Sequence, residues 1–271
     1  MASAPLTPHD LSILERINNP EADPSAPLLI DSSLPKDPHI TDTALYQKIS
    51  SLEVDIIQSL QEAELQVAGL KPIPKSAPTP ISQYETCAES LGKLIDEYPS
   101  YASARNNRAQ AFRRLYGDGI LVQSSSPSPD PSVAPPLLTS SPSALLSAST
   151  TLLNDIALAI SLLTPSTPFA PLSPHTAKTL SSSYTQRGAL YHTTAKLLSL
   201  PSSTLHISSS RPEAQWGVVD FEEAASSDFS MGGRYGNEVA KALAVAANPT
   251  AKLCGEMVRS AMRREYGGGG P

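Results

Sequence analysis

The chain is poor in aromatic residues and in cysteine. Aromatic side chains make up 5% of its 271 residues, and its two cysteines, Cys87 and Cys254, stand far apart. Both fall inside helical patterns, so we expect small, buried, apolar side chains in a reducing compartment rather than a disulfide framework. We therefore expect a cytoplasmic protein, with the nucleus as the other open compartment.

Histidine, positive charge and long apolar runs are also scarce. The five histidines show neither HxxxH nor HExxH spacing, so we expect no metal and no cofactor. A net charge of −6 argues against nucleic acid and anionic membranes as partners. No uninterrupted apolar run reaches the roughly 18 residues of a transmembrane helix. Residues 1–5 lack the basic start and apolar stretch of a secretory signal.

Proline and serine are abundant, and they cluster between segments with helical periodicity. There are 26 prolines. In the segments between them, apolar residues recur every three or four positions, which predicts amphipathic helices. Asp42 precedes the first long segment and suits a helix N-cap. We expect a purely helical chain, with helices over residues 11–17, 42–68, 81–98, 100–116, 143–163, 174–198, 213–227, 238–247 and 249–266, and a glycine turn at Gly232–Gly233.

The most specific pattern lies in residues 184–191. Tyr184, Gly188 and Tyr191 have the spacing W-x2-L-G-x2-Y that opens a tetratricopeptide helix pair. Gly188 lets a second helix cross closely, and the two tyrosines fall on one helical face. Downstream, Gly217 and Phe221 continue the small–large pattern of a second helix. These spacings predict a helical-repeat binding surface.

The repeat spacing divides the chain into an array with insertions. We expect a mostly disordered segment with a short helix at 1–41, three repeats within 42–229, capping helices at 230–266 and a disordered tail at 267–271. The repeats cover about 42–99, 100–165 and 174–229, with inserted loops at 70–80, 121–142 and 200–212. The insertions are either neutral variation in tolerant loops or, at the Ser-Pro dipeptides within 124–142, sites of regulatory phosphorylation.

Three segments resemble the tetratricopeptide repeat protein 36 family. They are Leu14–Pro20 (LERINNP), Ala102–Ala111 (ASARNNRAQA) and Asn248–Met257, which carries NPxAxLCxxM. Gln186-Arg187-Gly188 is similar to the third repeat of that family. The resemblance implies a small three-repeat protein sealed by C-terminal helices. It also implies protein–protein contact linked to Hsp70-type chaperones and to tyrosine metabolism.

The residues themselves give the chaperone hypothesis little support. Co-chaperone domains of this type hold an acidic chaperone tail with a clamp of lysine, arginine and asparagine, because two carboxylates must be desolvated against charged donors. Asn107 stands at one clamp position, but Ser182 and Gln186 stand at two others, and the first-helix positions fall near Ser59 and Ala63. One of five clamp groups is therefore present.

Two further clusters have more than one interpretation. Arg105, Arg108, Arg113 and Arg114 either form a solvated face that pairs with acids of neighbouring helices or line a groove for an acidic peptide. The glycine-rich stretch 232–236 is either a turn or a phosphate cradle, but it lacks the Lys-Ser/Thr of a P-loop. Glu62, Glu64, Glu222 and Glu223 have no nucleophile or histidine beside them in the pattern, so we expect no enzyme.

We therefore predict an all-α tetratricopeptide-type solenoid of three helix pairs plus C-terminal capping helices. Its expected function is that of a non-enzymatic scaffold or adaptor that binds a protein or peptide on its concave face, with an Hsp70-type chaperone as one candidate partner. The alternative is a regulatory partner that stabilises a metabolic enzyme, such as one of tyrosine metabolism. The predicted partner-binding residues are Asn107, Arg108, Gln186 and Arg187, and we expect a monomer.

Overall fold

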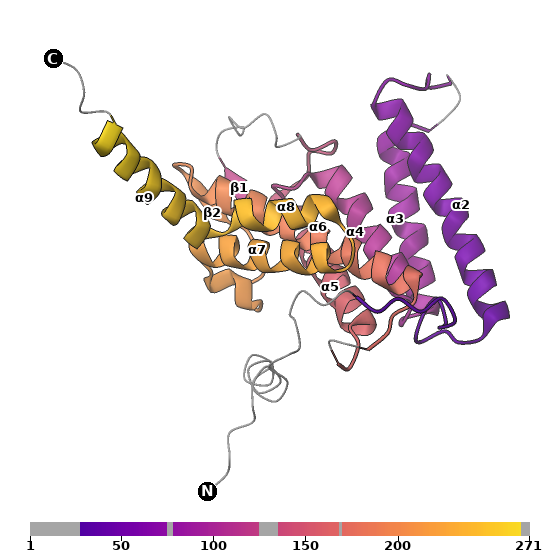
Figure 1. Cartoon of the computed structure of the whole chain (residues 1–271). Coiled ribbons are helices and arrows are strands. Elements are labelled where there is room, and N and C mark those ends of the chain that lie inside the picture. The colour runs from indigo at the N-terminus through magenta and orange to yellow at the C-terminus, as the bar shows by residue number, and fades with distance from the viewer. Residues whose placement is uncertain (1–27, 75–77, 125–134, 168–169, 267–271) are drawn as a thin grey trace, which may run out of the picture.

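The computed structural model describes residues 28–74, 78–124, 135–167 and 170–266, and within them the chain is mostly helical (Figure 1). The all-helical class is therefore confirmed in its main feature. The helices are α2 (Thr43–Val67), α3 (Pro80–Glu97), α4 (Ala102–Tyr116), α5 (Pro142–Leu163), α6 (Pro174–Leu198), α7 (Val218–Arg234), α8 (Glu238–Ala247) and α9 (Pro249–Tyr266).

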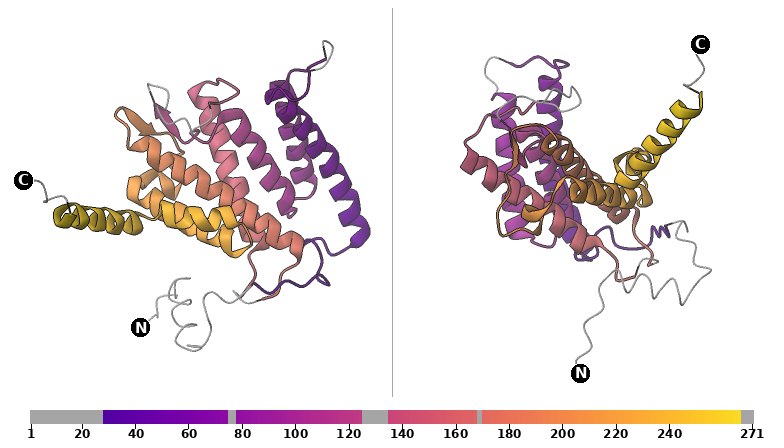
Figure 2. Two further views of the ribbon diagram at one scale, coloured as in Figure 1. Left: turned by 45° about the horizontal axis from the view of Figure 1, so that its top comes forward. Right: turned by 90° about the vertical axis from the view of Figure 1, so that its left-hand side faces the viewer.

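The helices from α2 to α8 each pack chiefly against their neighbours in sequence, and α4 also touches α6. The views in Figure 2 show the resulting row, with α2 at one end and α9 projecting from the other. The largest apolar core lies around α5, α6 and α7, where Leu152, Leu190 and Phe221 are fully buried. A second core joins α2, α3 and α4 around Ile49 and Leu91.

Short polar residues followed by proline explain where several helices begin. Thr79, Ser141 and Ser173 are the N-caps of α3, α5 and α6, and each is followed by a proline at the first helical position. Proline fits there because its missing N–H has no helical acceptor and its fixed φ suits the helix. The predicted cap Asp42 accepts from the backbone N–H of Ala44 at 2.8 Å, which confirms the start of α2.

Two predicted loops pair with each other, so the purely helical expectation is wrong here. β1 (Val122–Ser124) runs antiparallel to β2 (Ser203–Leu205), with Val122 opposite Leu205. Turn-forming residues around each strand predicted loops. The strands pair although they are about 80 positions apart, and local periodicity does not predict such a pairing. The Ser-Pro dipeptides at 126–129 lie outside the described residues.

The expected end of the sixth long helix and the glycine turn are also wrong. Pro212–Gln215 forms a short 3-10 helix, and α7 runs through Gly232 and Gly233 to Arg234. A Cβ at Gly232 would lie 2.6 Å from Thr185 Oγ1, and one at Gly233 would lie 2.8 Å from Lys241 Cβ. The glycines therefore serve close packing of α7 against α6 and α8 rather than a turn.

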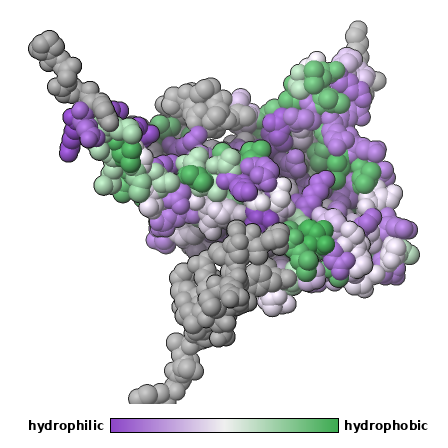
Figure 3. Space-filling model, in the orientation of Figure 1, coloured by the Kyte–Doolittle hydropathy of each residue, from purple (hydrophilic) through white to green (hydrophobic). Residues whose placement is uncertain are grey.

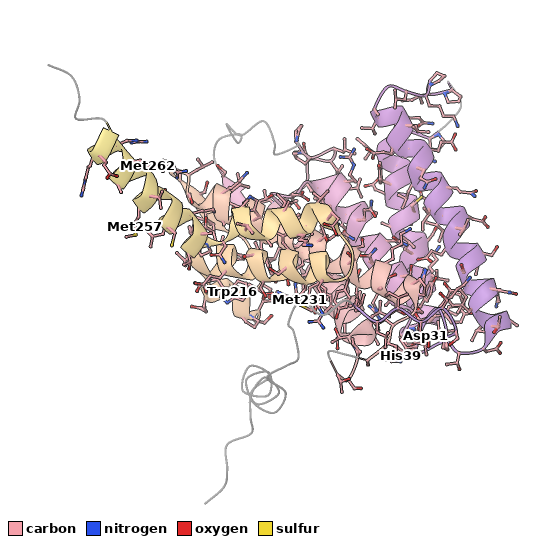
Figure 4. The ribbon with its side chains drawn as sticks, viewed as in Figure 1. Asp31, His39, Trp216, Met231, Met257 and Met262 are labelled. Atoms are coloured by element: carbon pink, nitrogen blue, oxygen red, sulfur yellow. The ribbon has the colours of Figure 1, made fainter. Side chains whose placement is uncertain are left out.

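The expectation of a mostly disordered N-terminal segment is wrong for residues 28–41. Asp31 N–H donates to the Leu172 carbonyl at 2.9 Å, and Leu172 N–H donates to the Leu29 carbonyl at 3.0 Å. The ring Nε2 of His39 lies 2.8 Å from the Leu162 carbonyl, and Figure 4 places Asp31 and His39 beside the start of the helical row. These contacts tie the segment to the ends of α5 and α6. The predicted helix at 11–17 lies outside the described residues.

Among the residues that the structure describes, one helix, α5, is long and apolar enough to cross a membrane by length and composition alone. It has 22 residues and a window of mean hydropathy 1.5, although serine, threonine and asparagine interrupt its apolar residues. The helix nevertheless buries Leu152, Leu153 and Ile156 in the main core and holds the buried Asp155 between arginines of α4. These contacts are those of the core helix of a helical protein.

The two cysteines differ in their surroundings. Cys87 is buried, its Sγ lies 3.7 Å from the Ile56 carbonyl, and burial raises the pKa of its thiol. Cys254 is exposed on α9, so the expectation that both cysteines are buried is wrong for this one. Cys254 does lie in a helix, as its helical pattern predicts, but its side chain is not covered by the part of the chain that the structure describes.

Candidate partner-binding surface

Two arginines at corresponding places on α4 and α6 hold the helix pairs together. Arg108 donates from Nε and Nη2 to the two carboxylate oxygens of Asp155 on α5, at 2.6 and 2.8 Å. Arg187 on α6 makes the same two bonds to Asp228 on α7, both at 2.7 Å. The planar guanidinium fork matches a carboxylate in this geometry, which makes the pair directional as well as strong.

The guanidinium group of Arg187 also lies close to the aromatic rings of the sequence motif. The guanidinium lies 5.7 Å from the Tyr184 ring centroid and 6.0 Å from that of Tyr191. Burial opposes its charge, but the hydrogen bonds to Asp228 outweigh burial and raise the pKa of Arg187 above its usual range. The side chain therefore stays charged and is occupied inside the protein.

Gly188 sets the distance between α6 and α7. A Cβ added there would lie 2.9 Å from a ring carbon of Phe229. The prediction that this glycine lets a second helix cross closely is confirmed. The crossing brings Tyr191 against Trp216 and Phe221 at ring-centroid distances of 5.5 and 5.6 Å.

A first groove of about 520 Å³ opens between α2, α3 and α4. Its walls carry the apolar side chains of Ile57, Leu60 and Ala111 and the amides of Gln61, Asn107 and Gln110, with Glu64, Tyr84 and Arg114 at one end. Apolar walls with a few placed polar groups are typical of sites that bind peptides or small molecules.

The charged end of this groove is internally paired. Arg114 Nε donates to Glu64 Oε2 at 2.9 Å, and the Tyr84 hydroxyl also donates to Glu64. Burial raises the pKa of Tyr84 to about 12, and its hydrogen bond to Glu64 acts in the same direction. Tyr84 therefore remains a donor at neutral pH, and the groove carries little net charge.

Asn107 links the first groove to a buried carboxylate. Its Nδ2 donates to Glu53 Oε1 at 2.8 Å, and the Tyr101 hydroxyl donates to Glu53 Oε2 at 2.5 Å. Glu53 is only 4% exposed. The side-chain amide of Asn107 thus stabilises the buried carboxylate of Glu53, and the same residue lines the groove. Replacing Asn107 therefore changes both the groove and the hydrogen bonding of Glu53.

A second groove of about 740 Å³ lies between α6 and the residues that lead into α8. Gln186 lines it but is buried, and its Nε2 donates to Asn106 Oδ1 at 2.8 Å. Lys178 and Glu238 lie at its rim with opposite charges. Hydroxyl-bearing residues of α6 and the apolar Ile30 and Val239 complete the lining.

The structure separates the four predicted partner-binding residues by role. Asn107 and Gln186 line the two grooves, whereas Arg108 and Arg187 join helices through their aspartates. Partner binding by these residues stays a prediction. Of the two interpretations of the arginine cluster, the one with acidic partners is confirmed for the pairing, because Arg105 and Arg108 meet Asp155, Arg113 meets Asp118 and Arg114 meets Glu64. Its expectation of a solvated face is wrong for Arg105, Arg108 and Arg113, whose side chains are at most 19% exposed.

Sequence reasoning missed the acidic partners Glu53, Asp155 and Asp228, and it treated Glu64 as merely solvated. A charged residue on the apolar face of a predicted helix was the available signal. Asp155 stands between Leu153 and Ile156 in α5, where an unpaired carboxylate would be too costly to bury. The sequence thus shows that a partner exists but does not identify it.

These features define a mostly helical protein whose helices pack consecutively and in which the buried Asp155 and Asp228 pair with arginines of the preceding helix. The chain belongs to the family of the L-tyrosine degradation gene cluster protein hmgX of Aspergillus fumigatus. It is 34% identical to that protein over 266 residues, covering 97% of this chain and 94% of the relative. No family model matches the chain, and no solved structure matches it significantly.

The resemblance to the tetratricopeptide repeat protein 36 family is therefore wrong. The match to the hmgX protein extends over almost the whole chain, whereas the earlier resemblance depended on short segments. One of these, Leu14–Pro20, lies outside the described residues. Another, Asn248–Met257, ends in a helix with Leu253 and Met257 exposed rather than in a sealed cap. Short helical patterns of this kind recur because many helix pairs meet the same packing requirement.

Proposed function

We propose that this chain is a non-enzymatic protein that binds and stabilises an enzyme of tyrosine metabolism. The observation that carries the proposal is the match to a protein named for an L-tyrosine degradation gene cluster over 97% of this chain. A gene cluster contains enzymes and accessory proteins alike, so the structure must supply the reason to favour the second class. Nothing in this match favours the chaperone hypothesis.

Several side chains that could take part in catalysis instead make structural contacts inside the protein. The Arg108 and Arg187 guanidinium groups are occupied by aspartates, and the Tyr191 hydroxyl donates to Glu213 at 2.9 Å. Burial raises the pKa of Cys87, which opposes formation of a nucleophilic thiolate. Polar groups that are bonded to each other inside the protein stabilise its fold, as in a scaffold. This supports the proposal of a binding protein.

We further propose that the helix pairs are repeats of one unit, of tetratricopeptide type. This proposal is supported by an arginine–aspartate ion pair that occurs twice at corresponding positions. The pair joins α4 to α5 through Arg108 and Asp155, and α6 to α7 through Arg187 and Asp228. In a repeat array the grooves between successive units form one extended surface, which suits a peptide segment of a larger partner.

The first groove is the proposed contact surface. Its apolar walls can receive side chains of a peptide, and the amides of Gln61, Asn107 and Gln110 can bond its backbone. Because Glu64 and Arg114 neutralise each other, a segment of low net charge fits better than the acidic tail of a chaperone.

The test is to mix the purified chain with each purified enzyme of tyrosine degradation and to measure binding and thermal inactivation of the enzyme. We expect one enzyme to bind stoichiometrically and to inactivate more slowly. Gln110→Lys, in the groove, should weaken binding by about tenfold, the effect of losing one contact of roughly 1.4 kcal/mol. Gln58→Lys changes another exposed glutamine, on α2 outside the groove, so this variant is the matched control and should bind normally.

Two results would count against the proposal. If none of these enzymes binds, the proposed function is wrong. If the Gln110 and Gln58 variants bind equally well, the first groove is not the contact surface, but the proposed function stands, because the partner then binds another surface. Asn107→Ala is less informative, since it also leaves the buried Glu53 without one of its donors.

A further inference from the structure

The two grooves of the helical row meet at one place. Asn107 lines the first groove, and its neighbour Asn106 accepts a 2.8 Å hydrogen bond from Nε2 of Gln186, which lines the second groove. Asn106 Oδ1 also accepts from the Ser183 hydroxyl at 2.9 Å. A single contact between α4 and α6 therefore separates the linings of the two grooves, which are adjoining parts of one surface.

The first groove runs along α2 and α4 away from this meeting point. Asn107 is bonded to Glu53 of α2, and about two turns later Arg114 is bonded to Glu64. Both helices therefore run in the same direction, and the groove extends from Asn107 toward their C-terminal ends. At 1.5 Å per residue, the distance along α4 from Asn107 to Arg114 is about 10 Å.

The second groove extends in the opposite direction. Its lining residues on α6 lie between Pro174 and Gln186, so it runs from the meeting point toward the start of this helix. Ala102 shares a core with Leu180, one to two turns before the contact of Asn106 with α6, so α4 and α6 are also parallel. The stretch from Pro174 to Gln186 is about 18 Å long. With about 10 Å between neighbouring helices, the joined grooves span about 30 Å.

The second groove contains a buried acceptor that lacks a donor. Gln186 is 5% exposed, and its Oε1 has no hydrogen-bond partner among the residues that the structure describes. Exchanging the two atoms of its amide does not solve this, because Nε2 donates to two oxygens of Asn106 and an oxygen in its place would oppose both. Buried polar atoms without a partner are rare. An N–H group of a ligand in the groove supplies the missing donor.

The rim of the second groove carries an unpaired positive charge. Lys178 is exposed and forms no ion pair with the residues that the structure describes, whereas Glu238 on the same rim has Lys241 3.9 Å away. Figure 3 shows hydrophilic and hydrophobic residues side by side along α8, whose first residues form one wall of this groove. Lys178 precedes Gln186 by about 12 Å along α6, a spacing that suits three or four residues of an extended chain better than a small molecule.

We propose that one extended segment of the partner enzyme, about nine residues long, lies through both grooves and carries an acidic residue beside Lys178. A strand rises about 3.3 Å per residue, so nine residues span the joined grooves. A backbone N–H of the segment donates to Gln186 Oε1, and its apolar side chains lie in the first groove. The acidic residue lies three or four positions from the residue that meets Gln186. This inference rests on the proposed function and specifies the segment that the partner presents.

An array of overlapping peptides identifies the segment. Peptides longer than the proposed segment cover each enzyme of tyrosine degradation and are probed with the purified chain, and the peptide that binds is shortened from both ends. We expect a minimal segment of about nine residues with Asp or Glu near one end. If a whole enzyme binds but none of its peptides does, this inference is wrong while the proposed function stands. If neither binds, both are wrong.

Substitutions in each groove test whether one ligand occupies both. Lys178→Glu should weaken binding of the minimal segment by about threefold to tenfold, and the effect should shrink with added salt, because the pair is exposed. Gln110→Lys in the first groove should weaken binding of the same segment by about tenfold. Lys93→Glu, which changes an exposed lysine of α3 outside both grooves, is the matched control. A segment that responds to only one of the two groove changes overturns the proposal.

Exchange of charge tests the contact with Lys178 directly. A segment whose acidic residue is replaced by lysine should bind the unchanged chain weakly and the Lys178→Glu variant well. Equal binding of both segments by both chains overturns the contact. Calorimetry with L-tyrosine tests a small molecule as the occupant. Binding of L-tyrosine that Lys178→Glu abolishes would assign the second groove to that ligand and overturn the proposal. Thermal unfolding should be unchanged in the Lys178 variant, because the side chain is exposed.

Discussion

Arg187 and Asp228 are joined by two parallel hydrogen bonds of 2.7 Å, and this pair connects α6 to α7 at the place where Gly188 lets the helices cross. The exposed fractions of the two side chains are 24% and 6%. The same relationship joins Arg108 to Asp155 one helix pair earlier. The repeated pair explains why a chain with few aromatic residues can still fix the angle between its helices.

We expect Asp228→Ala to lower the free energy of unfolding by about 3–5 kcal/mol, because Arg187 is left charged and largely buried without a partner. Replacing both residues together, Arg187→Met with Asp228→Leu, should recover most of this loss. Chemical denaturation measures both values. Lys71→Ala is the control, since its partner Glu62 is nearly half exposed, and the change should cost less than about 1 kcal/mol. Equal effects at the two pairs would contradict the structural role of Asp228.

Gly188→Ala should destabilise the protein by about 1–3 kcal/mol, because the new methyl group meets the Phe229 ring at 2.9 Å and forces α6 and α7 apart. Gly255→Ala in α9 is the matched change, since no neighbouring atom lies within 4 Å of its Cβ position. It should leave stability unchanged or raise it by up to about 1 kcal/mol, the helix propensity of alanine over glycine. Thermal unfolding of the two variants, side by side, checks the difference.

His175 should make stability depend on pH in the acid range. Its ring packs edge-on against Tyr46, its Nε2 is buried without a hydrogen-bond partner, and burial lowers its pKa below the usual 6.5. The unfolded chain therefore binds a proton first as pH falls. The stabilisation is present above about pH 6.5 and is lost as pH falls through the lower folded-state pKa.

The measurement is the free energy of unfolding between pH 4 and 7 for the unchanged chain and for His175→Gln. The difference between the two curves should change in favour of the variant as pH falls, with a slope of at most about 1.4 kcal/mol per pH unit. Parallel curves would show that the His175 ring takes up its proton equally well in both states.

Ser173 should matter more than an ordinary helix cap. It accepts from Thr176 N–H at 3.2 Å as the N-cap of α6, and its hydroxyl also lies 3.3 Å from the Lys36 carbonyl of the N-terminal segment. Ser173→Ala should therefore cost about 1–2 kcal/mol. Thr79→Ala, which removes only the cap bond of α3, should cost about 1 kcal/mol or less. Hydrogen exchange should also show faster opening of residues 30–40 in the Ser173 variant only.

Local sequence signals were sufficient to predict a helix wherever both of its ends carry a recognisable start or stop signal. The prediction of 174–198 matches α6, because Ser173 and Pro174 start the helix and a loop follows Leu198. The same reasoning failed at α7, because Gly232 and Gly233 are consistent with a turn or with close helix packing. Only the positions of Thr185 and Lys241, contributed by α6 and α8, decide between the two.

The candidate surface was predictable only in part. Asn107 and Gln186 were predicted to bind a partner on the concave face, and each does line a groove, although Gln186 is largely buried. Arg108 and Arg187 were predicted with them, because each directly follows one of these residues in the sequence. Their side chains point instead toward aspartates 47 and 41 positions away, a relationship that periodicity within one helix does not contain.

Residues at most a few positions apart are sufficient to specify most of the helices, because hydrogen bonds within a helix and the periodicity of its apolar face are local. The ion pairs between α4 and α5 and between α6 and α7, the β1–β2 pairing and the docking of residues 28–41 follow only from the tertiary structure, because each joins distant segments. The exposure of the apolar residues of α9 also follows only from the tertiary structure. An amphipathic pattern shows that a helix has an apolar side, but whether that side meets the chain's own core or remains exposed depends on how the other helices pack.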